Sequence, residues 1–178
     1  VILVIFQFLQ NWRAVIIPCL TIPVSLIGTL AVMAAFGFSI NTLTLFGLIL
    51  AVAIVVDDAI VVVENASRLL ETGQYSTEAV TKAMGEITGP IVGVVLVLLA
   101  VFIPTMLISG ISGQLYKQFA LTIAASTVLS GFNSLTLTPA LCALFLEKSK
   151  PSNFLIYKGF NKAYDKTQGA YDKIVKWL

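Results

Sequence analysis

The sequence lacks histidine, and only two of its 178 residues are cysteines. Histidine is the commonest metal ligand and the usual carrier of protons near neutral pH. We therefore expect no metal or other cofactor, and any proton chemistry must use carboxylates. Cys19 and Cys142 both lie in apolar segments. Cysteine packs there as a small hydrophobe, so these residues predict neither a disulfide nor a metal site.

Charge is also scarce. Charged residues make up 11% of the chain, hydrophobic residues make up 58%, and the mean hydropathy is +0.96. Soluble domains carry about 25% charged residues. A chain this apolar has too little polar surface to cover itself in water, so it belongs in a lipid bilayer. No nucleic-acid partner is expected.

Long apolar segments predict the fold class, an all-α polytopic transmembrane helix bundle. Residues 1–9 are apolar from the start, but nine helical residues reach only about 14 Å, half of the hydrocarbon core. We interpret them as the second half of a helix cut by fragmentation. Four segments long enough to cross follow at about 14–38, 42–63, 90–109 and 119–146. Together, residues 1–146 form the predicted bundle fragment.

The polar segments predict loops and surface helices. Residues 64–89 form a long polar connection that contains an amphipathic segment at 77–87, and residues 110–118 form a Gly/Ser loop. Residues 147–178 read as a polar linker followed by a basic amphipathic helix. Helices of this kind lie in the membrane interface, and Trp177 suits that depth. The other interpretation is a surface helix of a following soluble domain.

The positively charged residues lie mainly on one side of the predicted bundle. If the spans alternate in direction, all of the 11 Lys and Arg residues except Lys117 fall on the same face. The positive-inside rule makes that face cytoplasmic. The C-terminal segment is then cytoplasmic, and the helix at 42–63 runs from outside to inside.

Two adjacent carboxylates, Asp57 and Asp58, interrupt the apolar run of that helix. Asp57 lies seven residues before Glu64, which places it roughly 10 Å from the inner boundary. Membrane insertion costs about 2.5–3.5 kcal/mol for one Asp at a helix centre. Packing gives no reason to carry this cost twice, so the pair predicts a functional site. Glu64, at the boundary, reads as part of a solvated helix end.

The pair has the properties of a proton carrier. Its side chains point about 100° apart, so both can face one bundle interior. Close like charges in a low dielectric favour the protonated form of at least one carboxyl, so the two should titrate as a coupled unit. A structural salt bridge is the alternative, but no predicted span contains Lys or Arg. Gly47 and Ala51 have small-xxx-small spacing and predict close contact with another helix.

The residues around the pair resemble a known family. Asn41–Gly47 and Val56–Asn65 are closely similar to the fourth transmembrane helix of the resistance-nodulation-division (RND) exporters, hydrophobe/amphiphile efflux branch, of the AcrB type. Supporting stretches are Phe8–Arg13, Ala35–Asn41 and Leu137–Cys142. The resemblance covers nearly the whole chain, from the end of helix 2 to the surface helix after helix 6.

This resemblance implies a proton-coupled drug antiporter of the bacterial inner membrane, not an enzyme. Asp57 and Asp58 match the family's proton-carrying pair, with the proton as the coupling ion. The family pattern implies a homotrimer that works with a periplasmic adaptor and an outer-membrane channel. The porter domain and the second helical half, which supplies a lysine to the pair, lie outside this chain. The doubled Asp favours organic substrates over heavy metals.

Two other function classes remain open. An intramembrane aspartyl protease also uses two aspartates, but its chemistry needs one from each of two helices, and here both lie on one. A non-drug member of the superfamily, such as a protein-translocation protein or a lipid or metal exporter, would share the fold and often an intramembrane Asp.

Overall fold

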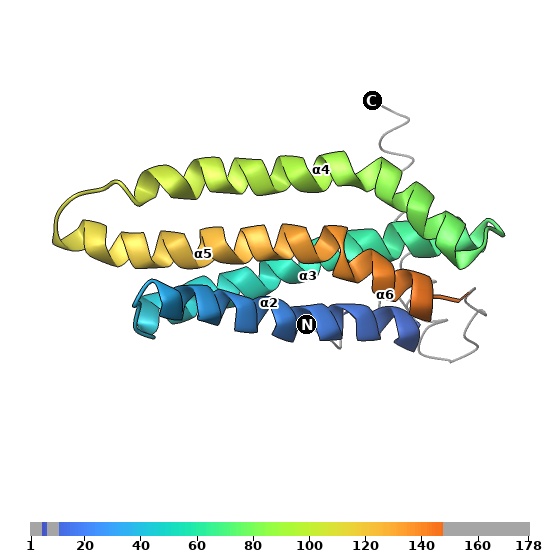
Figure 1. The fold of residues 1–178 in the computed structure, drawn as a ribbon, viewed down its shortest axis with the longest axis horizontal. Coiled ribbons are helices and arrows are strands. Elements are labelled where there is room, and N and C mark those ends of the chain that lie inside the picture. Colours follow the sequence, from blue (N-terminus) through green and yellow to red (C-terminus); the bar gives the residue numbers. More distant parts are fainter. Residues whose placement is uncertain (1–4, 7–10, 148–178) are drawn as a thin grey trace, which may run out of the picture.

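The structure, a computed structural model, describes residues 5–6 and 11–147. Among these residues it contains α-helices and no strand, which confirms the predicted all-α class. The helices, labelled as in Figure 1, are α2 (Trp12–Ala35), α3 (Thr42–Glu71), α4 (Ser76–Thr105), α5 (Ile111–Leu135) and α6 (Leu137–Phe145).

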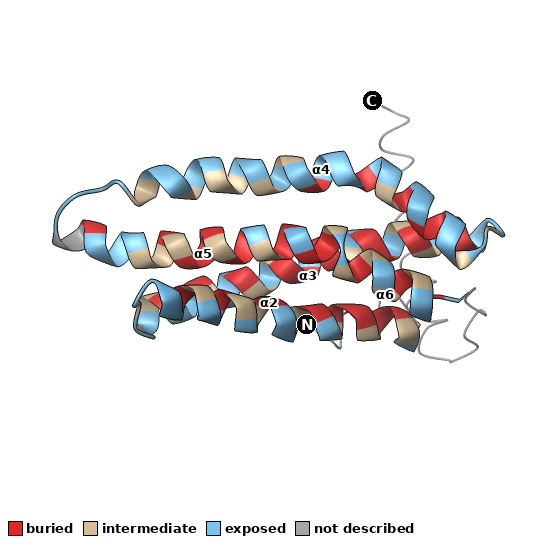
Figure 2. Cartoon of the chain, in the orientation of Figure 1, coloured by how far each residue is buried: buried red, intermediate tan, exposed pale blue. Residues whose placement is uncertain are grey.

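The helices pack side by side along one direction, with α5 at the centre of the bundle. It contacts α3 along much of its length and also packs against α2 and α4 (Figure 1). Buried residues lie along the contacts among α2, α3, α5 and α6 and on the first turns of α4, whereas most of the rest of α4 is exposed (Figure 2).

Local signals explain where the helices begin. The Asn41 side chain accepts hydrogen bonds from the backbone N–H groups of Leu43 and Thr44, while the Thr44 hydroxyl accepts one from the Asn41 N–H. This capping box satisfies donors that the first turn of α3 would leave unpaired. The Asn41 amide also donates to Gln118 Oε1 at 2.7 Å, so the same residue joins α3 to α5.

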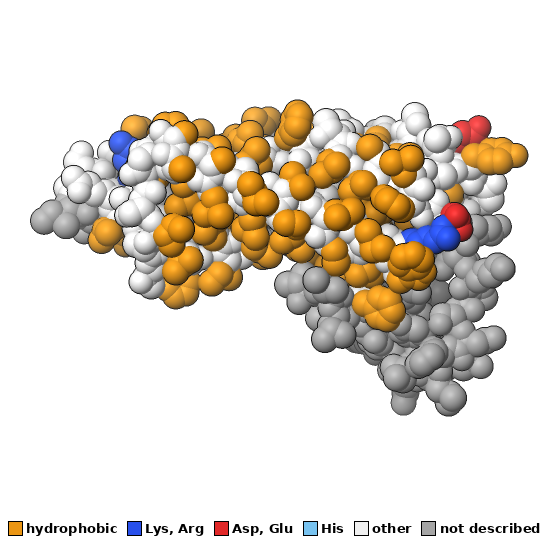
Figure 3. Space-filling model, turned by 60° about the horizontal axis from the view of Figure 1, so that its bottom comes forward, with side chains coloured by type: hydrophobic (Ala, Val, Ile, Leu, Met, Phe, Trp, Pro, Cys, Tyr) orange, Lys and Arg blue, Asp and Glu red, His pale blue; other side chains and the backbone are white. Residues whose placement is uncertain are grey.

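Four segments in the described part of the chain are long and apolar enough to cross a membrane: α2, α3, α4 and residues 113–145. They correspond to the predicted spans at 14–38, 42–63, 90–109 and 119–146. Apolar side chains cover the middle of the bundle, and charged ones show only near its ends on the face in Figure 3. The prediction of four full spans is confirmed.

The predicted connection at 64–89 is wrong in extent. Helix α3 continues to Glu71 and α4 already begins at Ser76, so the turn between them is only a few residues long. The amphipathic segment at 77–87 is helical, but it forms the first turns of α4 and not a separate element. Its apolar stripe packs against the end of α3 through Ala66, Leu69, Ala79 and Ala83. That burial stabilises both helices beyond the length the bilayer requires.

The predicted loop at 110–118 is also mostly helical, since α5 begins at Ile111. At its other end, the last predicted span divides at Thr136, where the backbone leaves helical geometry (φ −123°, ψ −68°). Pro139 follows within α6, and a proline there cannot donate to the carbonyl four residues earlier. The partial helix at 1–9, apart from Ile5 and Phe6, and the surface helix within 147–178 lie outside the described residues.

Candidate functional site: a carboxylate pair divided between a helix contact and an open helix face

Helix α3 places the two aspartates in different surroundings. Asp58 is buried, with 9% of its surface exposed, whereas its neighbour Asp57 is exposed. Consecutive helical residues point about 100° apart, and within the described part of the chain only the direction of Asp58 is covered by another helix. The expectation that both carboxyls face one interior therefore holds for Asp58 alone in this fragment.

Asp58 is held by a residue of α5. The Ser130 hydroxyl donates a hydrogen bond to Asp58 Oδ2 at 2.6 Å, and this contact joins positions 72 residues apart in the chain. A hydroxyl donor stabilises the carboxylate, and the same hydroxyl can accept from the protonated acid. Ser130 was not predicted from the sequence. The signal was present as a polar residue at every fourth position of α5, at Thr122, Ser126, Ser130 and Ser134.

Further polar side chains of α2 and α5 lie in the bundle interior. The Asn133 amide of α5 donates to Ser25 Oγ of α2 at 2.7 Å. On α2, the Thr29 hydroxyl donates to the Ser25 carbonyl at 2.8 Å and is itself fully buried. Hydroxyl and amide groups can rearrange to suit either protonation state of a nearby carboxyl. Asp58 therefore sits at the edge of a buried polar region formed by α2 and α5.

Small residues bring α3 and α5 close enough for this contact. A Cβ atom at Gly47 would lie 3.2 Å from Thr122 Cγ2 and 3.3 Å from Thr122 Cβ. Ala51, one turn further on, is fully buried. The predicted close contact of the Gly47 and Ala51 face with another helix is confirmed, and the partner is α5.

The side of α3 that carries Asp57 is exposed in the described part of the chain. Exposed residues recur along it at helical spacing, at Phe46, Ile49, Ala53, Asp57, Val61, Glu64 and Arg68. Among the residues the structure describes, no Lys or Arg pairs with either aspartate. Arg68 lies 11 positions beyond Asp57 on the same helix, or roughly 16 Å along the axis. A salt bridge within the described fragment is thus not what holds the pair.

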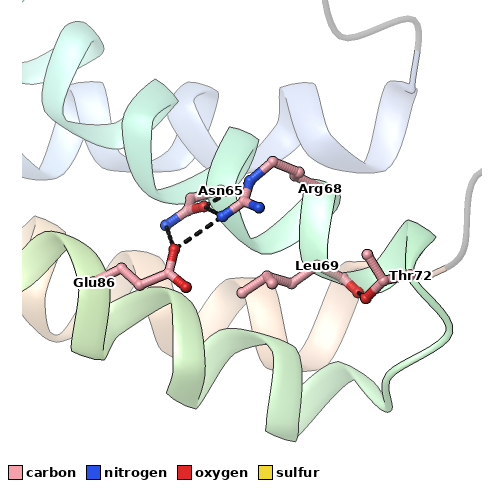
Figure 4. A network of polar contacts seen from close by, with 5 residues as sticks. All are labelled: Asn65, Arg68, Leu69, Thr72 and Glu86. Atoms are coloured by element: carbon pink, nitrogen blue, oxygen red, sulfur yellow. Dashed lines mark hydrogen bonds and ion pairs between the residues drawn. The ribbon is translucent and has the colours of Figure 1, made fainter.

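Arg68 pairs elsewhere, at the end of the bundle where α3 and α4 meet (Figure 4). Arg68 Nη2 lies 2.9 Å from Glu86 Oε2, and both Arg68 and Glu86 bond to the Asn65 side chain. Arg13 pairs with Glu147 at the same end. Glu64 is exposed as expected, but α3 continues seven residues past it, so it does not lie at a helix end.

The other heteroatom side chains form no metal centre in the described ranges. No group of three or more Cys, Asp and Glu side chains there is close enough to hold an ion. Cys142 is buried and Cys19 partly buried, and both are free thiols. Cys142 belongs to the apolar cluster of α2, α3, α4 and α6, which confirms its predicted role as a small core hydrophobe.

Comparison with known proteins places this geometry in context. The sequence profile of the AcrB/AcrD/AcrF family matches residues 1–178. The chain is 45% identical to the multidrug resistance protein MdtF of Escherichia coli (strain K12) over 177 residues, or 96% of this chain and 17% of MdtF. It is 51% identical to the multidrug export protein AcrF of the same strain over 148 residues, or 83% of this chain and 14% of AcrF.

A relative from another genus matches over the same region. The toluene efflux pump membrane transporter TtgB of Pseudomonas putida is 45% identical over 181 residues, or 98% of this chain and 17% of that protein. The chain therefore spans about a sixth of the length of the curated relatives that it matches.

Proposed function

Because this chain belongs to the AcrB/AcrD/AcrF family, we propose that it is the part of a proton-driven multidrug exporter that binds the coupling proton. Asp57 and Asp58 are the proton-translocating pair, and the proton is the only coupling ion. The complete protein exports organic compounds. The names of the relatives, which include multidrug and toluene efflux transporters, support this substrate class.

One observation carries the proposal: a buried carboxyl, Asp58, lies in an apolar helix with a hydroxyl donor on one side and a second carboxyl next to it. Each ionised Asp costs about 2.5–3.5 kcal/mol at a helix centre. Binding a proton removes most of that cost for one residue. Loss of the proton restores the cost unless a partner compensates. Proton binding to the pair therefore changes whether α3 needs a compensating partner next to its carboxylates.

The partner we propose for Asp57 is a cationic side chain, a lysine, from the second helical half of the protein. The exposed face of α3 that contains Asp57 is the surface that such a helix would cover. With Asp57 paired to a cation and Asp58 hydrogen-bonded to Ser130, release or uptake of one proton would favour different positions of the two halves.

The complete protein would act as an inner-membrane homotrimer, with a periplasmic adaptor and an outer-membrane channel as partners. The end of the bundle bearing Arg13 and Arg68 would face the cytoplasm, in line with the positive-inside rule. The family resemblance and the charge distribution support these assignments. On this proposal the protein is a secondary transporter, and we assign it no catalytic residue.

Exchange of each carboxyl for an amide tests the proposal. In the complete protein, Asp57→Asn and Asp58→Asn should each abolish drug resistance while membrane expression stays normal, because an amide cannot carry the proton. Glu64→Gln is a matched control, since Glu64 is exposed on the same helix and lies outside the pair. Normal resistance in both Asn variants would overturn the proposal.

A non-drug member of the superfamily is the second candidate, because it would share the helical fold and the intramembrane carboxyl. Expression of the complete gene in a strain that lacks its own exporters separates the two candidates. Raised resistance to several unrelated organic compounds identifies a drug exporter. Unchanged resistance with normal membrane expression would favour the non-drug class.

A further inference from the structure

Helix α5 is apolar on its exposed side as well as on the sides that pack against other helices. Val128 and Phe132 are exposed, while Leu129 lies so close to α2 that a Cβ atom at Gly28 would be 2.9 Å from Leu129 Cδ1. Lipid tails are as apolar as these side chains, so burial in a membrane provides no hydrophobic force between helices. Hydrophobicity therefore does not determine which side of α5 faces its neighbours.

Two polar residues of α5 bond to two different helices. The Ser130 hydroxyl donates to Asp58 Oδ2 of α3 at 2.6 Å, and the Asn133 amide donates to Ser25 Oγ of α2 at 2.7 Å. Ser25, Ser130 and Asn133 are all buried. Since Ser130 and Asn133 are three positions apart, their side chains point about 60° apart and lie about 4.5 Å apart along the helix axis. Bonds in these two directions hold α5 in one orientation.

These two bonds tolerate little rotation of α5. A side-chain atom about 6 Å from the helix axis moves by about 2 Å when the helix turns by about 20°. Hydrogen bonds span about 2.5–3.2 Å, so a movement of this size breaks them. Rotation would also turn the Asn133 amide away from Ser25, and an unpaired polar group in hydrocarbon is strongly disfavoured. The Asn133 bond therefore opposes any rotation that carries Ser130 away from Asp58.

We propose that Asn133 is a positioning residue for the carboxylate site. Its hydrogen bond to Ser25 fixes the rotation of α5 and thereby keeps the Ser130 hydroxyl against Asp58. The inference rests on the proposed function, in which Asp58 carries the coupling proton. Asn133 acts through Ser130 and not on the proton itself.

Few charged groups of the described residues lie near this carboxyl. On α3 they are its neighbour Asp57 and, further along the helix, Glu64. The charged residues of α2 and α5 are Arg13 and Lys117, and Lys117 precedes Ser130 by 13 positions, or roughly 20 Å. Those of α4 lie in its first three turns, and α6 has none. A substitution at the contact of α2 with α5 therefore changes no charge beside the carboxyl.

An apolar replacement of both partners tests the proposal. Asn133→Leu combined with Ser25→Ala removes the bond and leaves no unpaired group, a change that costs little stability. In membrane vesicles containing the complete protein, the pH midpoint of drug efflux should rise by up to about one unit, a tenfold change in proton concentration. The reason is that the hydroxyl which stabilises the carboxylate form is no longer held in place. An unchanged midpoint would overturn the proposal, whether or not activity falls.

Thr122→Val is the matched control. Its hydroxyl is equally buried on α5, but it donates to the Gln118 carbonyl of the same helix, so its loss releases no contact with α2. The midpoint of this variant should equal that of the wild type. An equal rise in Thr122→Val would show that any lost hydroxyl or amide of α5 has this effect, and the assignment of Asn133 would be wrong.

A combination with Ser130→Ala tests whether Asn133 acts through Ser130. Once the Ser130 hydroxyl is absent, its position no longer matters. The variant with all three substitutions should therefore have the same midpoint as Ser130→Ala alone. Shifts that add would show that the Asn133–Ser25 pair acts by another route.

A structural measurement separates this inference from the proposed function. In a cryo-electron microscopy map of the complete protein with Asn133→Leu and Ser25→Ala, Ser130 Oγ should lie more than about 3.5 Å from Asp58 Oδ2, beyond hydrogen-bond distance. The wild-type map, in which the two atoms should be in contact, is the control. Contact retained in the variant would overturn the inference. Drug efflux retained in Asp58→Asn would instead overturn the proposed function, and the map would still decide whether Asn133 positions Ser130.

Discussion

Asp57 and Asp58 are chemically identical neighbours, and the fold gives them different surroundings. The structure buries Asp58 against Ser130 and leaves Asp57 on the open face of α3. The sequence alone identifies the pair, because two carboxylates in an apolar helix have no inexpensive structural explanation. It does not tell them apart. Their side chains point about 100° apart, and this difference matters only where a neighbouring helix covers one of the two directions.

Removal of the Ser130 hydroxyl tests its hydrogen bond to Asp58. Ser130→Ala should lower drug efflux by roughly tenfold without loss of expression, because a hydrogen bond to a charged group contributes about 1.5–3 kcal/mol. Ser130→Thr keeps the hydroxyl and should recover most of the efflux. A purely packing role predicts instead that Ala, which is smaller but apolar, is tolerated at least as well as Thr.

The measurement that separates positioning from packing is the pH dependence of efflux. Loss of the Ser130 hydroxyl removes a donor to the carboxylate form of Asp58, so proton release becomes less favourable. The pH midpoint of efflux should therefore move upward in Ser130→Ala and return in Ser130→Thr. A midpoint that stays unchanged in the alanine variant while activity falls would assign Ser130 a structural role only.

At the scale of elements, hydropathy predicts where helices cross the membrane but not where they end. The apolar residues predict spans at 42–63 and 90–109, yet α3 and α4 continue to Glu71 and back to Ser76. These extensions are helical because Leu69 and Leu70 pack against Ala79 and Ala83. Such packing depends on how two helices pair, so the hydropathy of each segment taken separately does not predict it.

The contact between α3 and α5 yields a prediction of its own. Gly47→Ala would place a methyl group 3.2 Å from Thr122 Cγ2, so α3 must shift or Thr122 must move. We expect a net loss of stability of up to about 2 kcal/mol, because overpacking costs about 1–3 kcal/mol and the higher helix propensity of Ala offsets about 1 kcal/mol of it. The readout is the thermal unfolding temperature of the complete protein in detergent.

A double-mutant cycle checks the cause. Thr122→Ser deletes Cγ2 and keeps the hydroxyl that bonds to the Gln118 carbonyl. Combined with Gly47→Ala, it should restore part of the lost stability, because the deleted atom is the closest one. Strictly additive effects of the two substitutions would show that the glycine is needed for another reason.

At the scale of the whole molecule, this chain corresponds to a helical part of longer relatives. It contains four membrane-length segments and spans about 17% of the length of its relative MdtF. Its composition was sufficient to predict a bilayer environment and an all-α bundle. The surfaces left open, the Asp57 face of α3 and most of α4, could not be assigned a partner from the sequence, because an apolar helix face can pack against another helix or against lipid.

Proton flux measures most directly whether the carboxylate pair couples proton movement to drug export. The complete protein is reconstituted into liposomes with an imposed pH gradient, and dissipation of the gradient is followed on addition of a transported drug. We expect drug-stimulated proton flux in the wild type and in Glu64→Gln, and none in Asp58→Asn. Stimulated flux at the wild-type rate in Asp58→Asn would contradict it.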